Sequence, residues 1–201
     1  MVNDIFPILV SFIYVIAVLL VSYLLESHGR LGRESARKLV HFLVSLWVFV
    51  MVYWMDSLWA RILGPIAFIF INTFMTLKAR EGRAIGMIFF PVALLAVSIL
   101  YSFSLISAET AISSVLVMGA GDSAAALIGT RYGRHQLFSK SIEGFTAMFA
   151  VSFIVLLAFS SLPWEESFLI AFVAAAAEVL APHGLDNLTV PFAVILMMEV
   201  L

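Results

Sequence analysis

Long apolar runs separated by short polar connections dominate this sequence. Most runs are about 17–22 residues long, which is the length that an α-helix needs to cross the hydrocarbon core of a bilayer. We therefore predict eight membrane-spanning helices, with seven as the alternative because the last two runs are short. The predicted helices lie near residues 5–25, 39–55, 62–77, 85–106, 110–130, 144–162, 167–181 and 188–201.

The composition supports a membrane-embedded helical bundle. Of the 201 residues, 63% are hydrophobic and only 12% are charged, whereas a soluble domain carries about twice this charge density. The connections are too short for a soluble domain, so we predict one all-α integral membrane domain over residues 1–201. The N-terminus lacks the basic segment of a cleavable signal, so its first run is expected to be a retained helix.

Two classes of function are excluded by charge and by residue type. The net charge of −2 gives no reason to expect a nucleic-acid partner. The chain has no cysteine, which excludes disulfides, thiolate zinc sites and a cysteine nucleophile.

Basic residues gather on one side of the predicted bundle. Ten of the eleven Lys and Arg residues fall in alternate connections, and Arg61 falls on the other side. The ten are Arg30, Arg33, Arg37, Lys38, Lys78, Arg80, Arg83, Arg131, Arg134 and Lys140. Because cytoplasmic loops are enriched in Lys and Arg, we expect these connections in the cytoplasm and the N-terminus outside.

Asp122 is the most unusual polar residue, because it lies inside an apolar run nine residues before Arg131. That places it about 13 Å along a helix from the basic end. A carboxylate at this depth costs a few kcal/mol unless it is paired, hydrated or metal-bound, so Asp122 is a candidate functional residue. On this argument alone, its neutralisation is expected to leave stability unchanged or raised.

Small residues recur at every fourth position beside Asp122. They are Gly121, Ala125, Gly129 and Gly133. Such a stripe is typical of closely packed membrane helices. It would also let a bulky anion approach the backbone while Asp122 holds a cation.

Three further polar clusters lie on the predicted cytoplasmic side. In 36-ARKLVHF-42, a helix places Arg37 and His41 on one face, either as a basic membrane rim or as part of a site. In 139-SKSIEG-144, the serine before the next helix could cap it. In 178-EVLAPHGLDNLTVP-191, Pro and Gly break the helix before an Asp-Asn pair, which either caps the next helix or binds ions.

Carboxylates, cations and glycine-rich helix ends on one side of a bundle are the groups that phosphoryl or nucleotidyl transfer requires. Neither a Walker A sequence nor a glycine-rich dinucleotide motif is present, which excludes soluble kinase folds. A transporter would also explain buried Asp122 and Glu178, but the outer side has no matching clusters and no inverted repeat is visible.

Four segments occur in the order 37-RKLVH-41, 121-GDSAAALIGTRYGRH-135, 140-KSIEG-144 and 184-GLDNLTVP-191. Together they resemble the CTP-dependent lipid-alcohol kinases, namely dolichol kinase, phytol kinase and CTP-dependent diacylglycerol kinase. The resemblance implies transfer of the CTP γ-phosphate to a membrane-embedded lipid alcohol with Mg²⁺ as cofactor. These enzymes are similar to phosphatidate cytidylyltransferases, which stay the alternative.

The short chain resembles the compact prokaryotic or plastid form of this family, without the extra N-terminal spans of eukaryotic dolichol kinases. That implies an integral protein of a prokaryotic cell membrane with its active site on the cytoplasmic side.

The resemblance places Asp122, Lys140, Glu143, Asp186 and Asn187 on motif positions of the family, and a working model built on it gives these and neighbouring residues their roles. Asp122 and Asp186 are expected to hold Mg²⁺ with Glu143 in support, and His41 or Glu178 is expected to activate the alcohol. The expected substrate-binding residues are Arg37, Lys38, Gly121, Ser123, Gly129, Arg131, Gly133, Arg134, Lys140, Ser141, Gly144 and Asn187, of which Asn187 also supports the metal.

Overall fold

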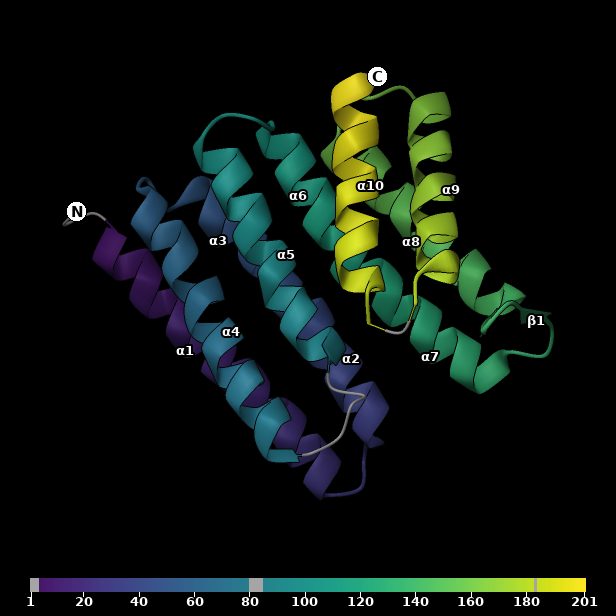
Figure 1. Ribbon diagram of the computed structural model, residues 1–201, viewed down its shortest axis with the longest axis horizontal. Coiled ribbons are helices and arrows are strands. Elements are labelled where there is room, and N and C mark those ends of the chain that lie inside the picture. Colours follow the sequence, from purple (N-terminus) through teal and green to yellow (C-terminus); the bar gives the residue numbers. More distant parts are fainter. Residues whose placement is uncertain (1–3, 80–84, 183) are drawn as a thin grey trace.

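The structure, a computed structural model, describes residues 4–79, 85–182 and 184–201. Over these residues the chain forms eight helical segments and one short hairpin, which confirms the all-α membrane-type bundle (Figure 1). The first half contains α1 (Ile5–Ser27), α2 (Arg33–Ser45) continued by α3 (Trp47–Tyr53), α4 (Leu58–Ala79) and α5 (Ile85–Ser102). The next segment begins as α6 (Ala108–Leu116), passes through a π-helix, η3 (Val117–Gly121), and ends as α7 (Asp122–Tyr132). The hairpin strands β1 (Gln136–Leu137) and β2 (Lys140–Ser141) follow, and then α8 (Ile142–Phe159), α9 (Trp164–Leu180) and α10 (Asp186–Val200).

Four helical segments among the described residues are long and apolar enough to cross a membrane: Ile5–Ser27, Arg33–Tyr53, Ala108–Tyr132 and Ile142–Phe159. Shorter apolar stretches lie at Leu58–Phe74 and Gly86–Ser102. The number of crossings and the outward N-terminus stay predictions. Of the basic residues used to orient the chain, Arg80, Arg83 and the side chain of Lys78 lie outside the described residues.

Helix α1 turns its large apolar side chains outward and its small and polar ones inward. Its buried residues are Pro7, Ser11, Val18 and Ser22. The Ser11 hydroxyl accepts a hydrogen bond from Trp47 Nε1 at 2.9 Å, and Ser22 donates to the Ala36 carbonyl at 2.9 Å. Because lipid is as apolar as leucine, helices in a membrane associate through close packing and hydrogen bonds of this kind.

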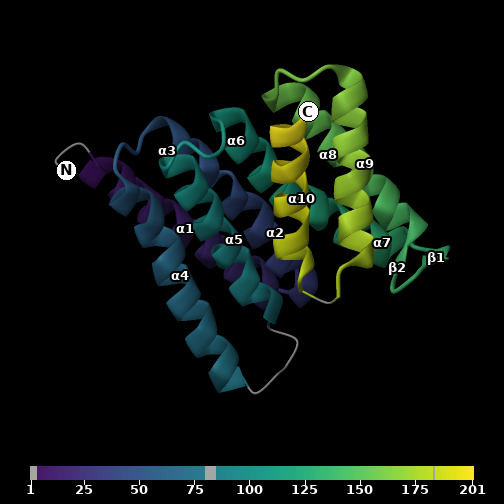
Figure 2. The same ribbon diagram turned by 45° about the horizontal axis from the view of Figure 1, so that its top comes forward.

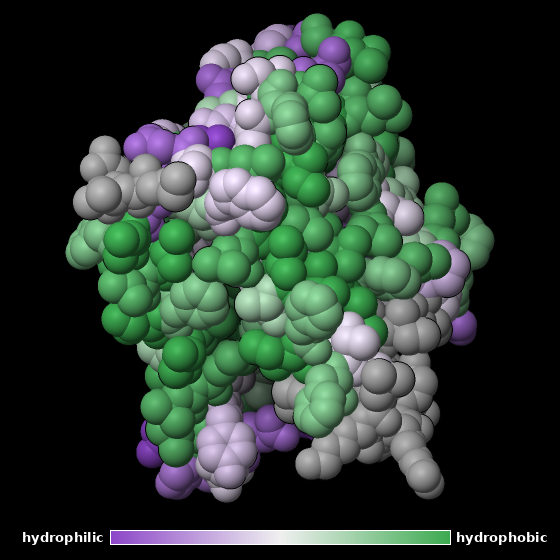
Figure 3. Space-filling view, turned by 60° about the vertical axis from the view of Figure 1, so that its left-hand side comes forward, coloured by the Kyte–Doolittle hydropathy of each residue, from purple (hydrophilic) through white to green (hydrophobic). Residues whose placement is uncertain are grey.

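The face formed by α1 and α4 is a broad hydrophobic surface. Figure 3 brings this side forward, with hydrophilic residues gathered toward the upper and lower ends of the view. Ile13 on α1 is 67% exposed and Phe70 on α4 is 72% exposed. An apolar surface of this extent is expected where a protein meets the hydrocarbon of a bilayer.

The segment Ala108–Tyr132 changes from α-helix to π-helix just before Asp122. Two glycines in this π-helix are in close contact with neighbouring helices. A Cβ on Gly119 would lie 2.2 Å from Ser45 Cβ on α2, and a Cβ on Gly121 would lie 2.6 Å from Met148 Sδ on α8. Single π-helical turns recur at functional sites. Here the turn precedes the predicted functional carboxylate.

The ends of the helices define two sides of the bundle. The C-terminus lies at the top of Figure 1, whereas the α1–α2 turn and the end of α7 lie toward the lower side, with the hairpin at the right-hand edge. Figure 2 shows the hairpin projecting beyond α7 and α8. The helix ends that carry the predicted site residues belong to the lower side.

The topology can be tested with single cysteines, since the chain has none. We expect an impermeant thiol reagent to label Ser161→Cys in intact cells, because the α8–α9 connection is predicted to face outward. Ser139→Cys in the hairpin should react only after the membrane is permeabilised. Labelling of Ser139→Cys in sealed cells would contradict the orientation.

The close contact at the π-helix can be tested with one methyl group. Gly119→Ala should lower the free energy of unfolding by about 1–3 kcal/mol, because overpacking forces α2 and η3 apart. Gly64→Ala is the matched control, since a Cβ there would meet only Trp47, at 3.9 Å. Thermal unfolding in detergent measures both, and equal stabilities would rule out the proposed contact.

Candidate active site

A cavity of about 960 Å³ opens where the predicted cytoplasmic ends of several helices meet. Its walls come from α2, α7, the hairpin, the end of α9 and the start of α10, with Gly86 of α5. Residues of all four sequence motifs therefore line this cavity. The predicted site residues that line it are Arg37, Lys38, Asp122, Gly129, Gly133, Arg134, Lys140, Ser141, Gly144, Glu178, Asp186 and Asn187.

Three carboxylates form the centre of this cavity. One oxygen each of Asp122, Glu178 and Asp186 lies within 4.8 Å of the others. Asp122 begins α7 directly after the π-helix, Glu178 lies one turn before the break between α9 and α10, and Asp186 begins α10. The broken helix thus folds two carboxylates of one motif toward a third from the middle of the bundle.

Two lysines neutralise most of this charge. Lys38 Nζ lies 2.5 Å from Asp122 Oδ2, and both side chains are buried. Lys140 Nζ contacts Glu178 Oε1 and lies 3.2 Å from Asp186 Oδ2. Burial lowers the pKa of Lys140, but Glu178 and Asp186 raise it by more, so its pKa lies above the usual value. Three carboxylates facing two ammonium groups leave one net negative charge.

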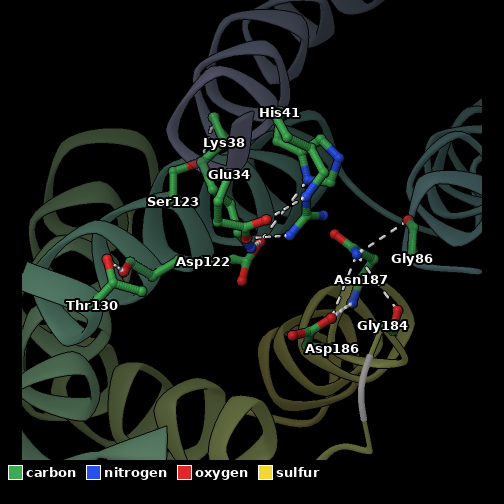
Figure 4. Close-up of polar contacts among 12 residues, drawn as sticks. Glu34, Lys38, His41, Gly86, Asp122, Ser123, Thr130, Gly184, Asp186 and Asn187 are labelled. Atoms are coloured by element: carbon green, nitrogen blue, oxygen red, sulfur yellow. Dashed lines mark hydrogen bonds and ion pairs between the residues drawn. The ribbon is translucent and has the colours of Figure 1, made fainter. Parts of the chain in front are cut away.

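Two buried oxygen atoms at the cavity have no hydrogen-bond partner among the described residues: Glu178 Oε2 and Asn187 Oδ1. The Asn187 amide nitrogen donates to the Gly86 carbonyl at 3.3 Å, which fixes the orientation of its side chain (Figure 4). Carboxylate and amide oxygens are the ligands that Mg²⁺ takes in proteins. The net charge, the clustered carboxylates and the free oxygens therefore fit a divalent cation.

His41 lies behind Asp122 rather than on the cavity wall. Its Nδ1 is 3.9 Å from Asp122 Oδ2, which is too long for a hydrogen bond, and this nitrogen has no hydrogen-bond partner among the described residues. The His41 ring stacks on Phe90 of α5, with ring centroids 4.4 Å apart. Figure 4 shows His41 and Lys38 on the same helix, above Asp122.

The N-terminus of α8 supplies a second feature of the cavity. Ser141 caps this helix, because its hydroxyl accepts a hydrogen bond from the Gly144 backbone N–H at 3.1 Å. A Cβ on either Gly129 or Gly133 would lie 3.0 Å from Ser141 Oγ, so small residues are needed where α7 passes this end. The first N–H groups of α8 are already hydrogen-bonded, since Ile142 N–H donates to the His135 carbonyl and Gly144 N–H to Ser141 Oγ.

Several residues expected in the site lie elsewhere. Glu143 is not on the cavity wall and instead pairs with His135, whose Nδ1 is 2.9 Å from Glu143 Oε1. Arg131 lies over its neighbour Tyr132, and Gly121 packs against Met148. Ser123 donates to the Lys38 carbonyl at 2.8 Å, which joins α7 to α2.

These positions differ from the roles expected for Glu143, for Asp186 and for the pair Gly121 and Ser123. Glu143 is replaced in the acidic cluster by Glu178, which the sequence had suggested as a base. Asp186 does not cap α10 from outside the helix, since Leu185 is the N-cap and makes no side-chain bond there. Gly121 and Ser123 hold helices together instead of lining the cavity.

Other cavity residues were not identified from the sequence. Glu34 makes a bidentate ion pair with Arg37, through contacts of 2.5 and 3.1 Å. The three-residue spacing of this pair on a helix was a usable signal. Gln136 and Ser139 of the hairpin and Gly86 of α5 also line the cavity, and nothing in the local sequence distinguishes them.

The comparison with known proteins follows this geometry. No protein-family model and no solved structure matches the chain. The phytol kinase of Synechocystis sp. is 32% identical over 201 residues, which cover 89% of this chain and 84% of that protein. This chain belongs to the phytol kinase family. The membership confirms the lipid-alcohol kinase family that the four motifs suggested. The structure brings these four motifs of the chain together at one cavity.

The buried ion pair revises the expected effect of neutralising Asp122. Asp122→Asn should lower the free energy of unfolding, by on the order of 3 kcal/mol, because it leaves the Lys38 ammonium buried without a counter-charge. The cost of burying the carboxylate alone would predict unchanged or raised stability. The double variant Lys38→Met with Asp122→Asn should recover much of the loss. Denaturant or thermal unfolding measures the cycle, and an unchanged single variant would contradict the pairing.

Proposed function

We propose that this protein is a kinase that transfers the γ-phosphate of CTP to the hydroxyl of a lipid alcohol, with Mg²⁺ bound in the cavity. The acceptor class rests on the phytol kinase relative, so an isoprenoid alcohol is the first candidate. CTP rests on the resemblance of the four motifs. The observation that carries the proposal is the cluster of Asp122, Glu178 and Asp186 facing two lysines in one cavity.

The carboxylates would hold the cation, with Asn187 Oδ1 as an additional oxygen ligand. Bound Mg²⁺ would neutralise the charge that develops on the transferred phosphoryl group. Lys38 and Lys140 now balance the carboxylates, and a divalent cation would release their ammonium groups to contact phosphates. Arg134 lines the same cavity, and its guanidinium favours anions.

In the proposed reaction, the alcohol oxygen forms a bond to the γ-phosphorus of CTP. The bond from that phosphorus to the oxygen that bridges to the β-phosphate breaks, and CDP leaves with the electron pair. The alcohol proton passes to a base. We assign this role to Glu178, because it lines the cavity and its Oε2 has no hydrogen-bond partner among the described residues, whereas His41 lies behind Asp122 and off the cavity wall.

The proposed location is the cytoplasmic face of a prokaryotic cell membrane. A lipid alcohol would place its chain among the helices and its hydroxyl at the polar cavity. The nucleotide would enter from water on the side where the basic residues gather.

The identity of the transferred phosphorus tests the function. Purified protein in liposomes is incubated with lipid alcohols or phosphatidate and with CTP labelled at the α or the γ position. We expect label to enter the alcohol only from γ-labelled CTP, with CDP as the other product. Label entering phosphatidate only from α-labelled CTP would instead identify a cytidylyltransferase. No transfer from CTP, ATP, GTP or UTP would contradict both enzymes and favour a transporter.

Substitution of Glu178 and of Glu143 tests which glutamate supports the metal. The structure places Glu178 in the carboxylate cluster, whereas the sequence predicts Glu143. Glu178→Gln should lower kcat by about a hundredfold or more at limiting Mg²⁺, because it removes a charged ligand from the cluster. Glu143→Gln is the matched substitution and should retain most activity, since Glu143 is not on the cavity wall and pairs with His135 at its edge. Initial rates over a Mg²⁺ series measure both, and a reversed order of the two effects would refute this assignment of the cluster.

A further inference from the structure

We propose that His41 is a positioning residue, which holds the Asp122 carboxylate by a hydrogen bond when Lys38 leaves it to contact a phosphate. This inference rests on the proposed function, in which a cation and a nucleotide occupy the cavity. His41 does not line the cavity, so it acts through Asp122 and touches neither of them.

The His41 side chain is buried and carries an unused polar atom. The residue is only 4% exposed, and its Nδ1 has no hydrogen-bond partner among the described residues. Buried polar atoms in folded proteins are normally hydrogen-bonded, so each exception calls for a physical reason. Packing alone would be served by an apolar ring at this position.

The unused nitrogen faces one particular oxygen atom. His41 Nδ1 lies 3.9 Å from Asp122 Oδ2, and the same oxygen accepts a hydrogen bond from Lys38 Nζ at 2.5 Å. Lys38 and His41 are three residues apart on α2, so both side chains leave the same face of the helix toward Asp122 (Figure 4). Asp122 Oδ2 therefore has two neighbouring nitrogen groups, of which only the lysine is bonded to it.

The surroundings hold the imidazole ring in this orientation. It stacks on the buried ring of Phe90, with the centroids 4.4 Å apart and the planes 15° from parallel. The bond from Ser123 to the Lys38 carbonyl keeps α2 and α7 together. A shift of about 1 Å would then bring Nδ1 within hydrogen-bond distance of Oδ2. Hydrogen bonds of active sites are often long before substrate binds and shorten in the complex.

The departure of Lys38 creates the need for this second donor. The Asp122 side chain is 4% exposed, so water cannot easily replace the ammonium group at Oδ2. The N–H of a neutral imidazole can fill that position without adding a charge. Asp122 would then keep its full negative charge for the cation, with its other carboxylate oxygen available as a ligand. Carboxylates that bind metals are commonly held by such outer hydrogen bonds.

Two substitutions separate the hydrogen bond from the packing. His41→Phe keeps an aromatic ring against Phe90 but has no N–H, whereas His41→Asn loses the ring but retains an amide N–H close to the position of Nδ1. Binding of Mn²⁺ is followed by electron paramagnetic resonance with CTP present. We expect His41→Phe to weaken Mn²⁺ binding by about tenfold or more and His41→Asn to retain most of the affinity.

The dependence on CTP distinguishes positioning from a merely structural role. Without CTP, Lys38 holds Asp122, so Mn²⁺ binding by His41→Phe should differ much less from the wild type. Equal Mn²⁺ affinities of the wild type and His41→Phe with CTP present would overturn the role of His41 and leave the kinase intact. A loss in His41→Asn at least as large as in His41→Phe would do the same. Absence of Mn²⁺ binding by the wild type would instead overturn the cation site of the proposed function.

A measurement on the wild type covers the case in which His41→Phe does not fold. The four histidines are labelled with ¹⁵N, and the signals of His41 are those missing from the spectrum of His41→Asn. We expect Nδ1 to carry a proton, whose resonance moves downfield when Mg²⁺ and CTP are added without an alcohol. A proton on Nε2 alone, or a resonance that does not move, would contradict the proposal.

Discussion

The cost of placing a carboxylate deep inside a membrane bundle governs the arrangement of this protein. Asp122 is only 3% exposed, and a buried carboxylate must find a counter-charge or a cation. Its partner is Lys38, which comes from a helix distant in sequence. Removing either member would leave a buried unpaired charge, so α2 and α7 must stay together. The bond from Ser123 to the Lys38 carbonyl and the contact of Gly119 with α2 maintain this approach.

The same requirement explains the broken helix at the other side of the cavity. Glu178 and Asp186 would repel each other if both were charged and unpaired, and Lys140 lies between them. The hairpin brings Lys140 there, since it connects α7 to α8 at the cavity edge. The resulting site has two lysines arranged around three carboxylates, with one negative charge in excess. In the proposed function, a divalent cation and a phosphate would replace these internal ion pairs.

Much of the fold could be predicted because lipid imposes a simple rule on sequence. Every apolar run that we expected to be a helix is one, since backbone groups in a bilayer must bond within their own segment. The π-helix and the hairpin were not predicted, because they depend on contacts of Gly119 and on a two-residue pairing. The clustering of Asp122, Lys140 and Asp186 followed from the order of motifs. The separate positions of Glu143 and Glu178 did not, because the direction of a side chain at a helix end is set by tertiary packing.

A direct measurement of cation binding tests the central claim that the carboxylates form a divalent metal site. Mn²⁺ is titrated into the purified protein and followed by electron paramagnetic resonance, with and without CTP. We expect a Mn²⁺ site whose affinity rises when CTP is present and which is lost in Asp186→Asn but kept in Asp56→Asn, a change in the α3–α4 connection. Equal Mn²⁺ binding by all three proteins, with no dependence on CTP, would contradict it.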